Sequence, residues 1–478
     1  MVRMVLLFLL LFWVRSSVAQ EMLGVRNSNY AGIQSVFLNP SSIAGSRLPW
    51  DAEIAAGLML DNNFFYIPAR QASPVQFGKI AGQLRNRTIQ TRYDPRYPDQ
   101  TYNLSAAAIA MGPSFFAPLN SNTFIGFTMA VRGYADFRNV SGHLAQNLYT
   151  NFNDQSLWNK PWHDQYEKAF SASWIEYGLH YAKKISGRKN HKWLIGGGLS
   201  LLGGMLSAYA DQADLNYMIR DSSHIVVESS ALRFAKTKIA TEHISPSNLN
   251  HGSGLSANMG ISYSFGGRYS CNFRTANDYE DASDLPYVFK IGLSVVDWGF
   301  LRFSRNSTAY QLDPNSPFFH SDSTGTVSNT GSVSSFLRQL DSASGLAQNH
   351  FTLALPSALS LQADWNLFGN YYLNATIIKS LPHGSQPGMT RPDVYSLALR
   401  YESAWLEACV PFSLIYYGRW QPRLGLAFRI GYFFFGADAP GSLLGLNNFE
   451  RTDIYAGIRY FPLPKRHKSD LRCPEIPL

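Results

Sequence analysis

Charged residues are scarce in this chain of 478 residues, because Asp, Glu, Lys and Arg together make up only 15% of it, against about 25% in a typical soluble domain. Aromatic residues, in contrast, reach 14%. Low charge with many aromatic residues excludes a disordered chain and a coiled coil. The mean hydropathy of −0.14 is too low for a bundle of membrane helices. This combination is typical of a membrane β-barrel, whose strands meet lipid with alternate residues only.

Cysteine is nearly absent, with Cys271, Cys409 and Cys473 as its three occurrences. An odd number without a CxxC pair indicates neither a disulfide framework nor a thiolate metal site. The sequence also lacks the GxSxG, HExxH, P-loop and Rossmann glycine motifs. We therefore predict that the protein is not an enzyme, and we assign it no catalytic residue, metal or cofactor.

Positive charge exceeds negative charge, with a net charge of +8, but the basic residues are scattered singly along the chain. The only tight basic cluster, KRHK at 465–468, lies in the C-terminal tail and is interpreted as a solvated segment. The sequence therefore predicts no nucleic-acid function.

The N-terminus has the pattern of a secretory signal peptide. Arg3 is followed by an apolar run at 5–14 and by Ser17, Val18 and Ala19, which form a small-x-small cleavage site. The apolar run is about half as long as the ~20 residues that a membrane-spanning helix needs. We expect cleavage after Ala19, and Gln20 in place of cysteine argues against a lipoprotein.

Alternation of apolar and polar residues recurs along the rest of the chain. In 255–265, for example, Leu255, Met259 and Ile261 share one face, and Asn258 and Ser262 share the other. A soluble sandwich would show the same alternation, but the signal peptide, the low charge and strand lengths near ten residues favour a membrane barrel. The glycine-rich run at 193–210 is interpreted as a wall strand rather than a membrane helix. The expected strands are 52–67, 102–112, 122–138, 169–185, 192–210, 223–237, 253–266, 286–303, 306–312, 351–366, 369–379, 393–402, 404–417, 421–435 and 452–461.

Bacterial barrels use even strand numbers, so one of these fifteen segments is expected to be wrong. The predicted fold is an all-β, transmembrane antiparallel barrel of about fourteen strands with an N-terminal plug segment. The predicted division is a signal peptide at 1–19, a plug segment at 20–50, the barrel at 51–463 and a periplasmic tail at 464–478.

Short motifs carry a resemblance to a known group of proteins. The NPSSIAG element at 39–45 is similar to the Asn-Pro-Ala element that opens barrels of the long-chain fatty-acid transporter type. The whole chain resembles an uncharacterised outer-membrane barrel family of Bacteroidota, with LPSALSLQADWNL at 355–367 and DIYAGIRYFPL at 453–463 as matching strands. The resemblance implies an outer-membrane location and an N-terminal segment that folds inward as a plug containing Asn39, Pro40 and Ser41.

Isolated charges interrupt the polar faces of the expected strands, and we predict that they point into the lumen. Mixed signs on facing walls would pair across a narrow, plugged barrel, whereas a ring of one sign would indicate ion selectivity. His180 is interpreted as a hydrogen-bonded filler of the lumen. The predicted lumen-facing residues are Arg132, Asp136, Glu176, His180, Lys290, Arg400, Arg429 and Arg459.

Two functional hypotheses follow for a protein in the outer membrane of a Gram-negative cell. The first is passive transport of hydrophobic or amphipathic small molecules, which predicts an apolar pocket near the plug and a break in the wall. The second is a scaffold barrel that binds a secretion or surface-attachment partner, which predicts a filled lumen and ordered loops at 139–168 and 304–350. Expected partners are outer-membrane lipid, the barrel-assembly machinery, and either a hydrophobic ligand or a protein.

Overall fold

A computed structural model describes residues 21–66, 92–93, 101–150, 152–186, 191–222, 224–237, 250–266, 287–313, 326–328, 347–443 and 450–462. The predicted signal peptide at 1–19 and tail at 464–478 lie outside these residues. No helix within the described ranges is both long and apolar enough to cross a membrane.

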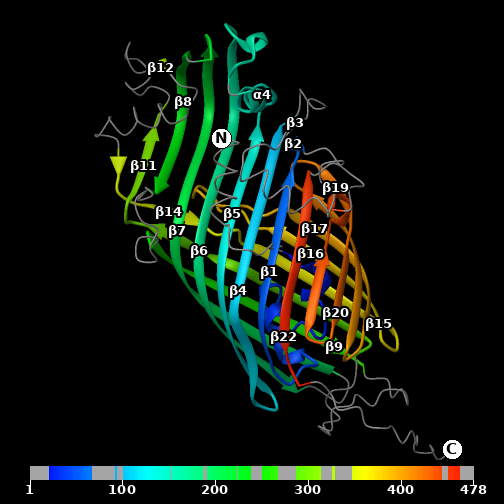
Figure 1. Cartoon of the computed structure of the whole chain (residues 1–478). Coiled ribbons are helices and arrows are strands. Elements are labelled where there is room, and N and C mark those ends of the chain that lie inside the picture. The colour runs from blue at the N-terminus through cyan, green and yellow to red at the C-terminus, as the bar shows by residue number, and fades with distance from the viewer. Residues whose placement is uncertain are drawn as a thin grey trace, which may run out of the picture.

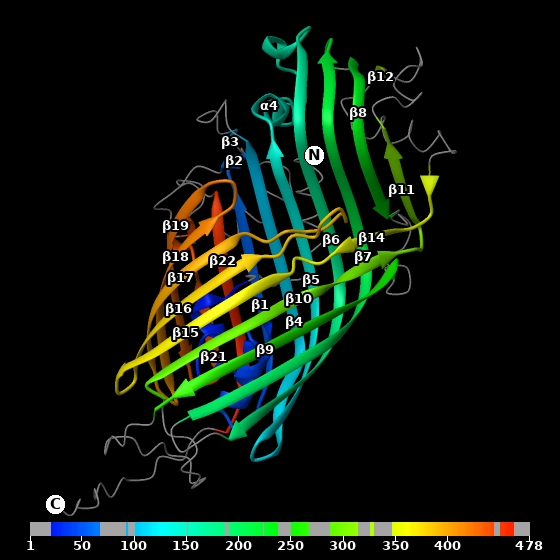
Figure 2. The ribbon, with the colours of Figure 1, turned by 180° about the vertical axis from the view of Figure 1, so that it is seen from behind.

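The wall is a closed ring of fourteen antiparallel strands, which confirms the predicted barrel (Figures 1 and 2). The last strand pairs with the first, from Ala52 opposite Tyr460 to Asp61 opposite Arg451. In ring order the strands are β1 (Asp51–Asn62), β4 (Tyr102–Asn120), β5 (Thr123–Val140), β6 (Pro161–Ser186), β7 (His191–Ile219), β9 (Gly252–Phe265), β10 (Phe289–Phe303), β14 (Phe351–Ala354) with its continuation β15 (Ala358–Phe368), β16 (Tyr371–Ser380), β17 (Asp393–Glu402), β18 (Leu406–Tyr416), β19 (Trp420–Leu424) with its continuation β20 (Leu426–Ile430), β21 (Phe433–Ala437) and β22 (Arg451–Tyr460).

One side of the ring continues beyond the barrel as a sheet extension (Figure 1). There the C-terminal part of β7 pairs with β8 (His224–Thr237), and β8 pairs with β11 (Ser307–Leu312) and β12 (Thr326–Ser328). The short strand β13 (Ala347–Gln348) pairs with β11. The helices α4 (Gly142–Thr150) and η5 (Gln155–Leu157) connect β5 to β6 at this end. After β1, the other described elements are the sheet of β2 (Phe65–Tyr66) and β3 (Arg92–Tyr93), and α7 (Pro440–Leu443).

Two details of the predicted ring are wrong. The segments 223–237 and 306–312 are strands, but they pair within the extension rather than in the ring. The segment 421–435 was expected to be one strand, yet the chain reverses after Ile430, where Gly431 has φ +57°. The turn shifts the alternation by one residue, so Phe433 faces outward and Phe434 is buried inside. Two of the fifteen predicted segments therefore lie outside the ring, and the hairpin adds one strand, β21, so the ring contains fourteen strands.

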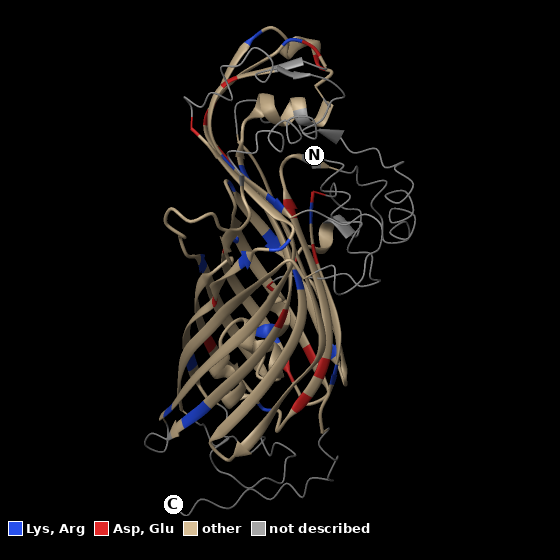
Figure 3. Ribbon diagram, turned by 90° about the vertical axis from the view of Figure 1, so that its left-hand side faces the viewer, with Lys and Arg blue, Asp and Glu red and all other residues tan. Residues whose placement is uncertain are grey.

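The outer face of the wall carries a continuous apolar belt. On β9, Leu255, Met259 and Ile261 are 40–56% exposed, while Asn258 and Ser262 on the inner face are 2% exposed. Aromatic residues mark both edges of the belt. Trp193 lies beside Tyr263 at the end of the barrel that carries the connections 121–122, 369–370 and 403–405, called the short turns below, and Tyr416 lies beside Trp420 at the opposite end. Figure 3 shows most of the wall free of charge. A closed barrel with this belt is a transmembrane barrel of the outer-membrane type.

The chain before β1 lies inside the barrel. Residues 21–48, called the N-terminal segment below, form α2 (Leu23–Arg26), η1 (Gly32–Phe37) and η2 (Pro40–Gly45), shown in blue within the lower half of Figure 1. Eight strands enclose a space that side chains alone can fill, and fourteen enclose a wider one. The N-terminal segment occupies that space with a buried apolar cluster that joins it to the wall: Met22, Val25, Ile33, Val36, Phe37 and Ile43 pack with Ile109, Phe116, Leu194 and Phe434.

Candidate functional site

Asn39, Pro40 and Ser41 lie against the wall at β7, β9 and β15. The Asn39 side chain caps η2, because its Oδ1 accepts hydrogen bonds from the Ser41 amide at 3.0 Å and from the Ser41 hydroxyl at 2.7 Å. Its Nδ2 donates to Gln362 Oε1 at 2.9 Å and to Ser262 Oγ at 3.2 Å. The same side chain therefore orders the N-terminal segment locally and attaches it to two wall strands.

Two wall glycines allow this close approach. A Cβ on Gly196 would lie 2.5 Å from the Pro40 carbonyl carbon, and a Cβ on Gly260 would lie 2.1 Å from Asn39 Oδ1. Both distances are far below van der Waals contact, so any larger residue would push the segment away from the wall. Within the glycine-rich run of β7, Gly196 thus allows the wall to approach the backbone of the segment.

We predict that Gly196→Ala loosens the N-terminal segment while the neighbouring Gly197→Ala does not. The Gly196 methyl group would collide with backbone atoms of Pro40 and Ser41, and overpacking of this kind costs about 1–3 kcal/mol. A Cβ on Gly197 meets only the Asn258 carbonyl oxygen, at 3.5 Å. Limited proteolysis of the segment in detergent micelles measures the difference. Equal protection of the two variants would contradict the close fit.

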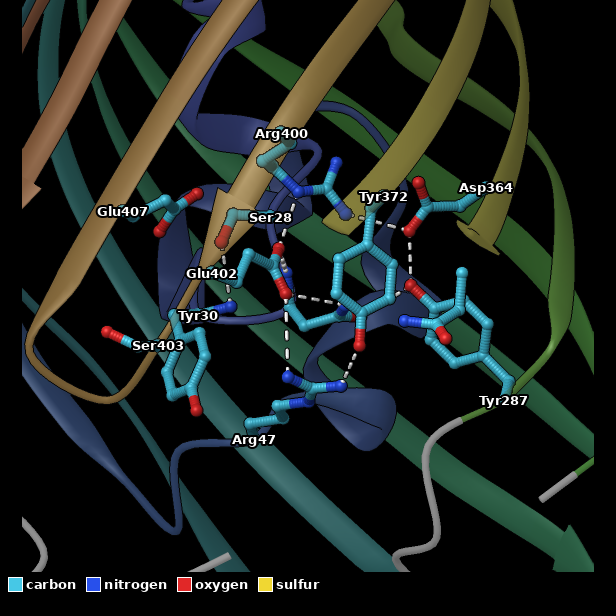
Figure 4. Close-up of polar contacts among 12 residues, drawn as sticks. Ser28, Tyr30, Arg47, Tyr287, Asp364, Tyr372, Arg400, Glu402, Ser403 and Glu407 are labelled. Atoms are coloured by element: carbon cyan, nitrogen blue, oxygen red, sulfur yellow. Dashed lines mark hydrogen bonds and ion pairs between the residues drawn. The ribbon is translucent and has the colours of Figure 1, made fainter. Parts of the chain in front are cut away.

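A charged cluster joins the N-terminal segment to β15, β16 and β17 (Figure 4). Glu402 accepts hydrogen bonds from the Asn29 amide and the Asn29 side chain, each at 2.9 Å, and from Arg400 Nε at 2.5 Å. Arg400 Nη2 also donates to Asp364 at 2.8 Å. Arg47 of the segment lies 3.6 Å from Glu402 and hydrogen-bonds Tyr372. This cluster pairs the predicted Arg400 with Glu402 on the same strand and with Asp364 two strands away, and it joins them to Arg47 of the segment.

A second group of charges joins the segment to the closing strands. Arg459 Nε lies 2.6 Å from Glu53 and 3.4 Å from Asp51, and it also donates to the Tyr30 carbonyl. Asp51 in turn accepts the amide of Ile33 at 3.1 Å. Close by, Arg429 Nε donates to Glu407 at 3.1 Å. The Arg459, Asp51 and Glu53 side chains are fully buried.

A third cluster centres on Asp297, which is not among the predicted lumen-facing residues. Both terminal nitrogens of Arg132 donate to Asp297, at 2.7 and 2.8 Å, and Arg132 also pairs with Glu176 at 3.1 Å. Arg391 Nη2 donates to Asp297 at 2.9 Å. Asp297 lies at a bulge in β10 with φ +56°, and two consecutive valines before it break the alternation. That break is the sequence signal that could have revealed it.

The other predicted lumen residues also have inward positions. Asp136 is fully buried and accepts the Thr390 amide at 3.0 Å. His180 Nε2 is 2.9 Å from Thr128 Oγ1, and no serine hydroxyl among the described residues hydrogen-bonds to it. The Lys290 ammonium lies 6.0 Å from the centre of the Tyr287 ring. The described residues also contain no group of three or more His, Cys, Asp or Glu arranged to hold a metal ion.

Two small polar cavities lie between the N-terminal segment and the wall. One, of about 10 Å³, is bordered by Arg26, Arg132, Trp174 and Arg391, among others. The other, of about 30 Å³, is bordered by Asn39, Lys290 and Gln362, among others. Such volumes suit water molecules rather than a ligand. Neither cavity is the apolar pocket near the N-terminal segment that the transport hypothesis predicts.

The chain was compared with known proteins. A family of unknown function, DUF5723, matches residues 92–438. No curated protein matches the chain. Among solved structures, it is similar to the toluene transporter TodX of P. putida, with a TM-score of 0.42 and 8% identity over 95% of this chain and 100% of that one. It is also similar to a FadL homologue of Pseudomonas aeruginosa, with a TM-score of 0.40 and 11% identity over 93% and 98% of the two chains.

Proposed function

The chain belongs to DUF5723, a family of unknown function, and we propose that its barrel is a gated passive transporter of hydrophobic or amphipathic small molecules. One observation carries this proposal: the N-terminal segment that fills the lumen is separate from the wall. It precedes β1 and takes no part in the strand ladders. Because side-chain contacts rather than strand pairing hold it, the segment can move while the ring of fourteen strands stays closed.

The inner surface of the barrel contains both aromatic and charged side chains, as a path for amphipathic solutes requires. Between the N-terminal segment and the sheet extension, an inward aromatic layer is formed by Phe170, Trp174, Tyr209, Phe303 and Phe351. The charged clusters around Glu402 and Arg459 lie nearer the short turns. A solute that passes the barrel would meet aromatic side chains beside charged ones, since Arg132 lies 5.2 Å from the centre of the Trp174 ring, and this favours molecules with both kinds of surface.

A scaffold that binds a protein partner at the cell surface is a second candidate, favoured by the filled interior and the sheet extension. In the connection at 139–168, α4, η5 and the start of β6 are ordered, and Trp158 and Trp162 pack against a core containing Tyr217 and Ile219. Most of the other predicted loop, 304–350, lies outside the described residues. The two candidates differ in whether the N-terminal segment ever leaves its position.

A reversible lock on the segment distinguishes them. The Ser41 and Ser262 hydroxyl oxygens are 2.7 Å apart, so cysteines at both positions are placed to form a disulfide. We expect the Ser41→Cys/Ser262→Cys variant to take up phenylnaphthylamine, a small hydrophobic dye, no faster than cells without the protein. Adding a reductant should restore uptake to the unmodified rate, because the segment is again held by non-covalent contacts only.

Each single-cysteine variant is the matched control, since neither can form the lock and both should transport at the unmodified rate. Uptake that is identical in locked, reduced and barrel-free cells would overturn the transport proposal and favour the scaffold.

A further inference from the structure

We propose that residues 381–392, the loop between β16 and β17, form a second closure of the lumen and that this closure is coupled to the N-terminal segment through Asp297. The inference rests on the proposed transport function, because it describes how that gate is held. The N-terminal segment approaches from the end of the short turns, and loop 381–392 approaches from the opposite end. The two meet at one buried cluster of charges.

The loop is folded into the barrel and continues its sheet. Met389 is fully buried and Arg391 is 4% exposed. The Ala354 amide donates to the Pro387 carbonyl at 3.0 Å, and the Met389 amide donates to the Ala354 carbonyl at 3.1 Å, so Gly388 pairs in parallel with the end of β14. The wall strand breaks directly after this point, between β14 and β15. The loop therefore occupies the place where the wall is interrupted.

Wall side chains hold the loop on the opposite side as well. The Thr390 amide donates to Asp136 at 3.0 Å, and the Tyr134 hydroxyl donates to the Thr390 carbonyl at 2.8 Å. Within the loop, His383 Nε2 lies 2.7 Å from the Met389 carbonyl. Burial lowers the pKa of His383 below its usual range, which favours the neutral ring as donor to that carbonyl.

The loop and the N-terminal segment share the Asp297 cluster. Arg391 of the loop donates to Asp297 at 2.9 Å and lies 3.7 Å from Glu21 of the segment. Arg132, which holds the other side of Asp297, stacks 6.0 Å above the ring of Phe37, also in the segment. One wall carboxylate thus connects both closures.

Coupling follows from burial. If the loop withdraws, Glu21, which is 5% exposed in the closed structure, loses its ion pair with Arg391. If the segment withdraws, Arg391 loses Glu21 and the Asp297 cluster loses the cover of Phe37. Uncompensated buried charge is unfavourable. Opening of either closure therefore makes opening of the other easier, and the effect must act in both directions.

Cysteine accessibility tests this coupling without any solute. In a chain whose three native cysteines are replaced by serine, Met389→Cys reports on the loop and Val36→Cys reports on the segment, since both side chains are fully buried. A membrane-impermeant maleimide labels each probe in proteoliposomes. We expect Gly196→Ala, which loosens the segment, to raise labelling of the loop probe by about tenfold, and Arg391→Met to raise labelling of the segment probe to a similar extent.

Arg391→Met is expected to fold, because Asp297 keeps both hydrogen bonds from Arg132. The labelling experiment with Gly196→Ala does not depend on whether Arg391→Met folds. Gln386→Ala, at an exposed position of the same loop, and Gly197→Ala are the controls that should leave both labelling rates unchanged. Loosening of one element without any rise at the probe in the other would overturn the coupling.

The outcome is separable from the outcome of the dye-uptake experiment. Coupled labelling in a barrel that takes up no dye would refute transport and retain the coupling. Dye uptake controlled by the Ser41–Ser262 lock without coupled labelling would retain transport and refute the second closure.

Discussion

Deletion of residues 22–48 is expected to convert the closed barrel into an open pore, with ion conductance in a planar lipid bilayer raised by at least about tenfold over the full chain. The wall closes through the ladder between β1 and β22, which the deletion leaves intact. The segment fills the lumen with an apolar cluster and short helices, and the deletion also removes the contact of Phe37 with the Asp297 cluster. The charged inner wall that remains suits a conducting path for ions.

Folding of the deletion variant can be verified separately, because an intact barrel migrates faster on a gel before heating than after it. A variant that keeps this shift and conducts no more than the full chain would show that removal of the N-terminal segment alone does not open the lumen. A tenfold rise would show that the N-terminal segment closes the lumen, and the Ser41–Ser262 lock then tests whether the segment moves in the intact protein.

Replacing Arg459 with methionine is expected to destabilise the protein by about 3–5 kcal/mol, because it leaves Asp51 and Glu53 buried without their cation. The Arg459 side chain lies between two fully buried carboxylates and also donates to the Tyr30 carbonyl, so its loss affects both the wall and the N-terminal segment. Urea unfolding in lipid vesicles, followed by tryptophan fluorescence, measures the change.

Two comparisons make this result specific. Arg459→Met/Glu53→Gln should recover part of the loss, since one uncompensated charge is removed. Lys379→Met breaks an exposed ion pair with Asp393 and should cost at most about 1 kcal/mol. Equal effects of Arg459→Met and Lys379→Met would indicate that water reaches the interior charges and screens them, contrary to the packed interior described above.

The sequence revealed much of the interior but not its connections. Arg132, Glu176 and Arg400 were predicted to face the lumen, because the alternation places them opposite lipid-facing residues. Their partners were not predictable in the same way. Asp297 lies at a bulge where the alternation breaks, and Arg391 lies in a loop that has no period at all. The pairs they form join residues 165 and 94 positions apart.

The sequence by itself determined the strand character, the apolar outer face and the approximate number of strands. The reason is local: a strand between lipid and lumen must alternate along its own length, whatever its neighbours are. Strand pairing and packing in three dimensions determine that 223–237 and 306–312 leave the ring, that 431–432 is a turn and that loop 381–392 folds inward. These features depend on which strands pair and on how much space the closed ring leaves inside. Pairing and enclosed space are properties of the whole ring, and no single strand contains them.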